Sequence, residues 1–236
     1  MKSKRIIGAV IAVMFFVAGL MQPFSANMAE AKGKTLSLTN SEGAVDFAAV
    51  QAYNPDIYAW IVIPNTKVNY PVVQSVVDDY YIMRNVDGSK GYPGALYTNR
   101  VNTKTFQDFN TVIYGHNMKN KTAFGSLHYF DKADFFNKNQ DMYIYTADGV
   151  YYYQIYSTVK YSNALILDQY PNALETSRQE YINLTLTGYA KSKVEHVREG
   201  VELTTEDKLV TLSTCINDAR YRYLVIAKQI SFVPYK

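Results

Sequence analysis

The chain has 236 residues, a formal net charge of +3, one cysteine and three histidines. A charge so close to balance excludes the strongly basic face that nucleic-acid binding needs. One cysteine cannot form an internal disulfide, and with three scattered histidines it offers no ligand spacing for a metal. We therefore expect no nucleic-acid partner, no metal and no cofactor.

The first 31 residues have the layout of an export signal. Three basic residues precede Ile6–Met21, a run of 16 residues that is apolar apart from two glycines. This order is typical of signal peptides, and 16 residues fall just below the roughly 17–25 of a membrane-spanning helix. Both a cleaved signal peptide and a retained membrane anchor fit this pattern. The positive-inside rule places Met1 in the cytoplasm and the later residues outside, so we predict a signal or membrane anchor with a short linker at 1–31 and one extracellular domain at 40–236.

Short strands dominate the rest of the chain, with helices between them. Apolar runs with a period of two, bounded by turn residues, predict strands, and longer runs with a helical period predict helices. The expected strands are 57–63, 68–73 (an edge strand because of Pro71), 95–98, 111–114, a hairpin of 142–145 with 150–159, 209–215 and 222–228. The expected helices are 44–52, 78–85, 122–137 and 177–191, with a long loop at 160–175. This mostly β pattern favours a closed or nearly closed β-barrel with peripheral helices.

Two of these strands hold the first candidate chemistry. The run Leu209–Cys215 ends in the only cysteine, and Arg222 opens the next strand. An antiparallel return would bring an arginine beside the thiol, a setting that favours the thiolate and produces a nucleophile. A free cysteine is more often a small buried apolar residue, but an unpaired thiol in an exported protein is either intermolecular or reactive. Arg220 lies two residues before Arg222 and is the alternative arginine; we prefer Arg222 because it opens the apolar strand.

His116 is the second candidate. It ends the predicted strand 111–114, follows Gly115, which permits a close approach, and shares a strand face with Tyr114. His128 is interpreted as a surface or half-buried helix residue, and His196 as part of a solvated polar stretch.

These motifs together resemble the sortases, and class B sortases in particular. The resemblance covers about residues 54–230, and the motifs that carry it are Asn69–Gln74, Tyr114-Gly-His116, Thr211-Leu-Ser-Thr-Cys215 and Arg222. It implies an eight-stranded β-barrel enzyme, anchored in the cell membrane of a Gram-positive bacterium by an N-terminal hydrophobic helix. It also implies catalytic roles for Cys215, His116 and Arg222, and a substrate groove lined by Ser213, Ile82 and part of the loop 163–167, including Leu167.

The resemblance further implies a reaction and its partners. A sortase of this type cleaves a Thr–X bond in an NPxTx-like C-terminal sorting signal and joins the acyl-enzyme to an amine of a cell-wall peptide or its lipid-linked precursor. Its protein partners are surface proteins that bear such a signal. Two alternatives are an L,D-transpeptidase-like wall enzyme, although no His or Gly adjoins Cys215, and a non-catalytic surface binding module.

Overall fold

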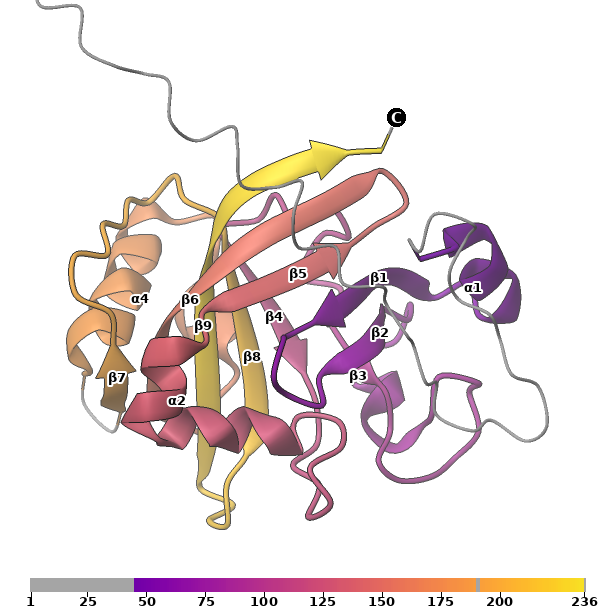
Figure 1. Cartoon of the computed structure of the whole chain (residues 1–236), viewed down its shortest axis with the longest axis horizontal. Helices are drawn as coiled ribbons and strands as arrows, with labels where there is room; N and C mark the ends of the chain where they lie inside the picture. The colour runs from indigo at the N-terminus through magenta and orange to yellow at the C-terminus, as the bar shows by residue number, and fades with distance from the viewer. Residues whose placement is uncertain (1–44, 190–191, 236) are drawn as a thin grey trace, which may run out of the picture.

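A computed structural model describes residues 45–189 and 192–235 (Figure 1). The predicted signal or anchor at 1–31 lies outside the described residues. Among the helices in the described ranges, none is long and apolar enough to cross a membrane.

Eight strands form a closed β-barrel. They are hydrogen-bonded in the order β5-β1-β2-β3-β4-β8-β9-β6, and a further pairing of β5 with β6 closes the ring, while β7 extends the sheet from β6. The bounds are β1 (Ile57–Val62), β2 (Asn69–Val73), β3 (Leu96–Tyr97), β4 (Asn110–Tyr114), β5 (Asp141–Tyr145), β6 (Gly149–Ser162), β7 (Lys193–Val197), β8 (Leu209–Cys215) and β9 (Tyr221–Pro234). The predicted mostly β barrel is confirmed.

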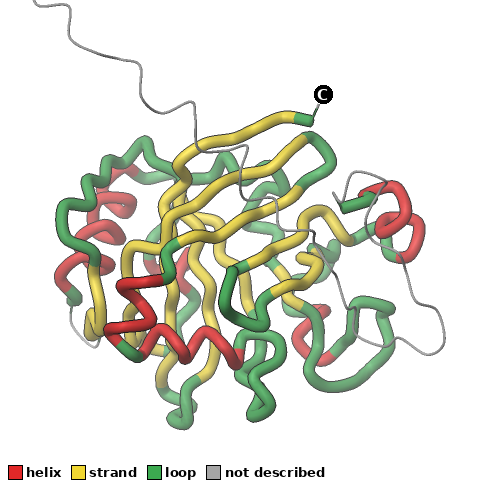
Figure 2. Tube along the Cα trace, in the orientation of Figure 1, coloured by secondary structure: helices red, strands yellow, loops and turns green. Residues whose placement is uncertain are grey.

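In the described ranges, six helices lie outside the barrel (Figure 2). They are α1 (Phe47–Tyr53), η1 (Tyr80–Met83), η2 (Gly125–Asp131), α2 (Ala133–Lys138), α3 (Ile166–Gln169) and α4 (Glu175–Thr187), with η1 and η2 of the 3-10 type. The edge strand expected at 68–73 was wrong, because β2 lies between β1 and β3 in the closed barrel. Pro71 fits there because it pairs with Trp60 of β1, while the pairing of β2 with β3 involves only Val72 and Val73.

Three further sequence-based expectations were wrong in detail. The single helix predicted at 122–137 is two helices, because Ala123 has a left-handed backbone (φ 47) and Lys132 is extended. Leu127 and Phe130, three residues apart, are both fully buried, a spacing that suits a 3-10 turn. The predicted loop 160–175 contains the end of β6 and α3, and the polar stretch around His196 is the strand β7.

Strand β8 is buried on both faces. Val210 and Leu212 point into the barrel, whereas Leu209 belongs to a second apolar cluster that includes residues of α3 and α4. On that outer face, the Tyr181 hydroxyl of α4 lies 2.6 Å from the Thr211 hydroxyl. Because apolar side chains pack on both faces of β8, every residue from Leu209 to Thr214 is buried. Cys215, the last residue of the strand, is the first that solvent reaches.

Candidate active site

The end of β8 places Cys215 directly opposite Arg222. The two strands pair antiparallel, with the register Ser213–Leu224, Thr214–Tyr223 and Cys215–Arg222. Residues directly opposite in an antiparallel pair point to the same face of the sheet, with their Cβ atoms about 4.5–5.5 Å apart. The expected return of an arginine beside the thiol is therefore observed in the backbone register.

Arg220 has a different environment. It lies in the turn before β9, its guanidinium is 2.7 Å from the Asp218 carboxylate, and its side chain is 80% exposed. The hydrogen bonds from Arg220 lower the pKa of Asp218 to about 2. Arg222 instead donates from Nη1 to the carbonyls of Ala219 and Tyr221, at 3.3 and 3.0 Å. Among the described residues, no carboxylate forms an ion pair with the Arg222 guanidinium. We therefore retain Arg222 as the predicted functional arginine.

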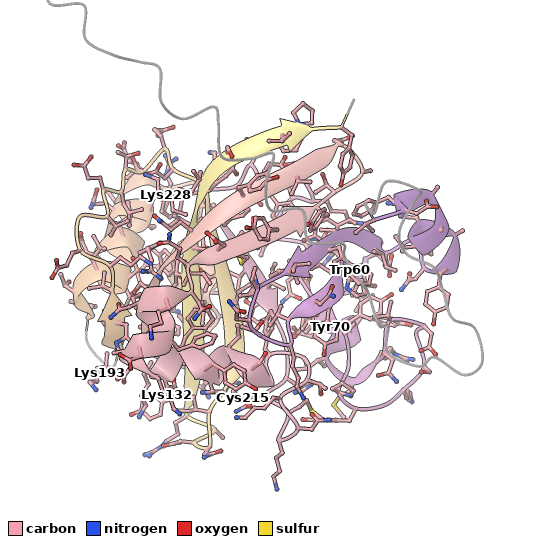
Figure 3. The ribbon with its side chains drawn as sticks, viewed as in Figure 1. Trp60, Tyr70, Lys132, Lys193, Cys215 and Lys228 are labelled. Carbon is pink, nitrogen blue, oxygen red and sulfur yellow. The ribbon has the colours of Figure 1, made fainter. Side chains whose placement is uncertain are left out.

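The segment that carries His116 is fixed to the same strand end. Strand β4 runs parallel to β8 with Tyr114 beside Ser213, so His116, two residues beyond β4, leaves the sheet at the same end of the barrel as Cys215. Figure 1 shows the two strands, and Figure 3 labels Cys215. The Gly115 N–H donates to the Ser213 carbonyl at 3.1 Å, and the Thr214 hydroxyl donates to the Gly115 carbonyl at 2.8 Å.

Gly115 allows this close packing. A Cβ at this position would lie 2.4 Å from the Leu96 Cδ2 and 2.6 Å from the Phe124 Cδ2. Any side chain would push the segment away from β3 and from η2, and would move His116 with it.

The ring of His116 is held by the segment between β2 and β3. Its Nε2 lies 2.6 Å from the Ile82 carbonyl, its Nδ1 lies 3.2 Å from the Tyr92 hydroxyl, and the two rings are 4.5 Å apart. Because a carbonyl oxygen only accepts, we assign a proton to Nε2. Nδ1 then accepts from the Tyr92 hydroxyl. Within the described part of the chain, neither nitrogen hydrogen-bonds to Cys215.

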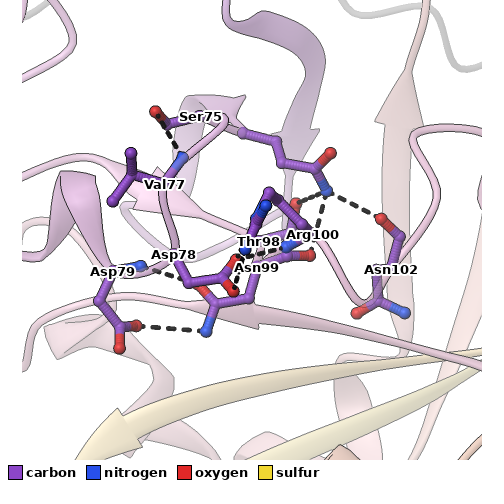
Figure 4. A network of polar contacts seen from close by, with 9 residues as sticks. Ser75, Val77, Asp78, Asp79, Thr98, Asn99, Arg100 and Asn102 are labelled. Carbon is purple, nitrogen blue, oxygen red and sulfur yellow. Dashed lines mark hydrogen bonds and ion pairs between the residues drawn. The ribbon is translucent and has the colours of Figure 1, made fainter.

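A polar network fixes the start of this segment (Figure 4). The Asp79 carboxylate accepts from the Tyr97 hydroxyl at 3.0 Å and from the Asn99 amide at 3.2 Å. The Asn99 amide oxygen in turn accepts from the Asp79 N–H at 3.0 Å, and the Arg100 N–H donates to Asp78 at 2.8 Å. These bonds hold η1, and therefore Ile82, against His116.

The buried Tyr97 and the half-buried Tyr114 lie on the face of the sheet near Arg222. The rings of Tyr97 and Tyr114 stack with their centroids 5.4 Å apart. Burial raises the pKa of both phenols, the Asp79 carboxylate adds to the increase, and the positive charge of Arg222 opposes it at Tyr97. The guanidinium therefore acts on the face of the sheet that carries Tyr97, which is also the face of Tyr114 and Ser213.

The three residues predicted to line the groove have different exposures. Ile82 is 42% exposed and touches His116 through its carbonyl, whereas Ser213 and Leu167 are each only 5% exposed. Leu167 packs in the same apolar cluster as Tyr114. The assignment of these residues to a substrate groove stays a prediction.

Sequence reasoning missed three residues at this end of the barrel. Tyr92 contacts His116, and both Asn117 and His128 reach the backbone carbonyl of Cys215. His128 was interpreted as a helix residue without a role, yet it lines a cavity of about 940 Å³ together with Cys215. The only signal in the sequence was that Asn117 follows His116. No arrangement of three or more His, Cys, Asp or Glu side chains fit to hold a metal ion occurs in the described residues.

The fold and this arrangement define a cysteine enzyme, and comparison with known proteins gives its family. The sortase domain family matches residues 61–230, so the chain belongs to the sortases. It is 28% identical to sortase B of Listeria monocytogenes over 193 residues, 80% of this chain and 75% of that protein. It is 27% identical to sortase B of Staphylococcus aureus over 187 residues, 78% of this chain and 74% of that protein.

Solved structures agree with this membership. A mutant form of Clostridium perfringens sortase B matches with a TM-score of 0.69 at 26% identity, over 78% of this chain and 86% of the other. A Streptococcus pyogenes class B sortase involved in pilus biogenesis matches with a TM-score of 0.68 at 29% identity, over 79% and 98%. The expected class B resemblance is confirmed, and the chain is a sortase cysteine transpeptidase that anchors surface proteins.

Proposed function

We propose that this enzyme cleaves a Thr–X bond in an NPxTx-like C-terminal sorting signal and transfers the protein to an amine of a cell-wall peptide or its lipid-linked precursor. The observation that carries the proposal is the position of Cys215 directly opposite Arg222. This pair lies at the end of the barrel where the His116 segment is fixed to β8. The class B relatives support the choice of signal.

The residue types suit acyl transfer in two steps. The Cys215 thiolate attacks the threonine carbonyl, and the C–N bond to residue X then breaks to leave a thioester. Arg222 holds the substrate backbone and stabilises the oxyanion that forms at the carbonyl oxygen. His116 protonates the leaving amine, and later accepts a proton from the incoming amine that displaces the thiolate.

We also propose that the enzyme is a single-pass membrane protein with its catalytic domain outside the cell. The support is the basic N-terminus followed by the apolar run Ile6–Met21, which the positive-inside rule orients with Met1 in the cytoplasm. An anchor would hold the enzyme where exported proteins emerge from the membrane.

The test is a peptide panel with the purified full-length enzyme in detergent. Peptides with NPxTx signals and scrambled versions are incubated with and without an amine acceptor, and products are identified by mass spectrometry. We expect cleavage between Thr and X, an amide product with the amine, and no cleavage by Cys215→Ala or His116→Ala. Cleavage by Cys215→Ala would overturn the proposal.

A further inference from the structure

The Asn117 side chain joins the catalytic cysteine to a second histidine. Its Nδ2 lies 2.9 Å from the Cys215 carbonyl oxygen and 3.1 Å from the His128 Nε2. Because the carbonyl oxygen only accepts, the Asn117 atom beside it is the NH₂ group. The His128 Nε2 is itself 3.2 Å from the same carbonyl oxygen, so the amide, the ring and the carbonyl are in mutual contact.

The environment of His128 holds its ring beside this carbonyl. Its Nδ1 lies 3.0 Å from an Asp131 carboxylate oxygen, and the side chain of His128 is 16% exposed. A carboxylate accepts, so Nδ1 carries a proton and donates to Asp131, which directs Nε2 at the Asn117 amide and the Cys215 carbonyl. The ring stacks on Tyr223 with the centroids 4.8 Å apart, which fixes its plane.

Helix η2 makes this geometry possible. Residues three apart lie above one another in a 3-10 helix, which aligns His128 with Asp131. The start of η2 packs closely on the segment after His116: the Phe124 N–H donates to the His116 carbonyl at 3.0 Å, and a Cβ on Gly125 would lie 2.3 Å from the Met118 carbonyl oxygen.

We propose that His128 is a positioning residue for the transpeptidase reaction. Together with Asn117, it holds the backbone carbonyl of Cys215 and fixes the strand end that carries the nucleophile against the segment that carries His116. His128 touches no reacting atom. The proposal rests on the proposed function, because it assigns Cys215 and His116 to the same reaction.

The first experiment compares substitutions at His128 by steady-state cleavage of the NPxTx peptide. His128→Ala removes the ring that contacts both Asn117 and the Cys215 carbonyl, and small displacements in an active site can cost up to about 100-fold in rate. We expect kcat to fall about tenfold, with KM unchanged within about twofold, since loss of positioning lowers kcat without removing substrate contacts. His128→Gln supplies an amide in place of the ring and restores most of the rate.

Three comparisons make this result specific. Asn117→Ala removes the other side chain that contacts this carbonyl and is expected to lower kcat by a similar factor, and the double variant with His128→Ala should lose less than the product of the two single losses, because both side chains act on one carbonyl. His196→Gln is the matched control, because His196 stacks on Phe136 and reaches only the Asp131 backbone carbonyl. Thermal melting identifies any variant that does not fold. If His128→Ala does not fold, the kcat of Asn117→Ala tests the proposal instead.

A second readout does not depend on activity. Cys215 is the only cysteine, so labelling cysteine with ¹³C at the carbonyl gives one resonance, which moves upfield when the carbonyl loses a hydrogen bond. We expect that shift in His128→Ala and Asn117→Ala and its absence in His128→Gln and His196→Gln. Full activity and an unmoved resonance in folded His128→Ala would overturn the proposal, as would equal impairment of His128→Ala and His128→Gln. Failure of the wild-type enzyme to cleave any peptide would instead refute the proposed function.

Discussion

Arg220 and Arg222 are two residues apart in the sequence but have different surroundings in the structure. Arg222 lies opposite Cys215, whereas Arg220 is exposed and paired with Asp218. Loss of one oxyanion-stabilising donor costs about 100- to 1,000-fold in kcat. We therefore expect Arg222→Ala to lower kcat for peptide cleavage by that factor, measured by steady-state kinetics.

Arg220→Ala is the matched control for that experiment. It removes the same charge two residues away and breaks only an exposed ion pair, so the rate should stay within about twofold, since exposed pairs contribute little. A large loss in Arg220→Ala with a small one in Arg222→Ala would reverse our assignment. Arg222→Lys should also be impaired, because an ammonium does not replace the planar guanidinium donors.

The Asp218–Arg220 pair makes a separate prediction about pH. Hydrogen bonds from Arg220 lower the pKa of Asp218 to about 2, compared with about 3.9 for an unperturbed aspartate. A lowered carboxyl pKa contributes stability that is present above about pH 4 and is lost as pH falls towards 2. An NMR titration of the Asp218 carboxyl should show this low midpoint, and Arg220→Gln should raise it. A midpoint near 4 in the wild-type protein would contradict the observed pairing.

Some residue-scale features could be read from the sequence and others could not. The position of Arg222 opposite Cys215 follows from two adjacent strands joined by a short turn, and period-two patterning predicts it. Tyr92 and His128 were missed because each meets its partner only through long-range packing: Tyr92 reaches a residue 24 positions away, and His128 reaches one 87 positions away. No local pattern encodes such a contact.

At the scale of elements, the packing of β4 against its neighbours depends on Gly115. A methyl group there would meet Leu96 and Phe124 well inside contact distance. Overpacking of this kind typically costs about 1–3 kcal/mol of unfolding free energy, and here it would also displace His116. We expect Gly115→Ala to be destabilised by that amount in a denaturant titration and to lose activity.

Gly91→Ala serves as its control. The nearest atom to a Cβ at Gly91 is the end of the Asn85 side chain at 3.0 Å, which can rotate away. Its stability should stay close to that of the wild-type protein. Equal stability of Gly115→Ala and the wild-type protein would show that the segment before His116 is not packed as described.

Strand elements were easier to predict than the helical segment that supports the site. The runs at 209–215 and 57–63 have clear apolar patterns, and both are strands. The segment 122–137 has a helical pattern, but the burial of Leu127 and Phe130 and the extended Lys132 divide it into η2 and α2. Tertiary packing decided its form, and that division places His128 and Asp131 together.

For the whole molecule, the 22 tyrosines predict sensitivity to alkali. Burial raises the pKa of many of them, with Tyr81, Tyr145 and Tyr161 each at about 12. A phenol pKa raised above its unfolded value of about 10 gives stability that is complete below pH 10 and is lost as pH rises through 12. We expect tyrosinate absorbance to show an exposed group that ionises first and a buried group that ionises with unfolding. Ionisation of all tyrosines near pH 10 in a folded protein would contradict this burial.

Closure of the barrel also belongs to the whole molecule. The hairpin of β5 and β6 and the pairing of β8 with β9 are local and could be predicted. The pairing of β1 with β5 and the long pairing of β6 with β9 join distant parts of the chain; the apolar pattern favoured a closed barrel without specifying these pairings, and the eight-stranded expectation came from the family resemblance. The parallel pairing of β4 with β8, which also joins distant parts of the chain, brings the ends of these two strands together, and the candidate site depends on that pairing.

The most direct test of the central claim is the intact mass of the enzyme during its reaction with an NPxTx peptide in the absence of an amine. Our account predicts a thioester adduct, equal in mass to the peptide up to and including threonine minus one water, located at Cys215 by proteolysis and released by an added amine as an amide. An adduct at any other residue, or amide product formed by Cys215→Ala, would contradict it.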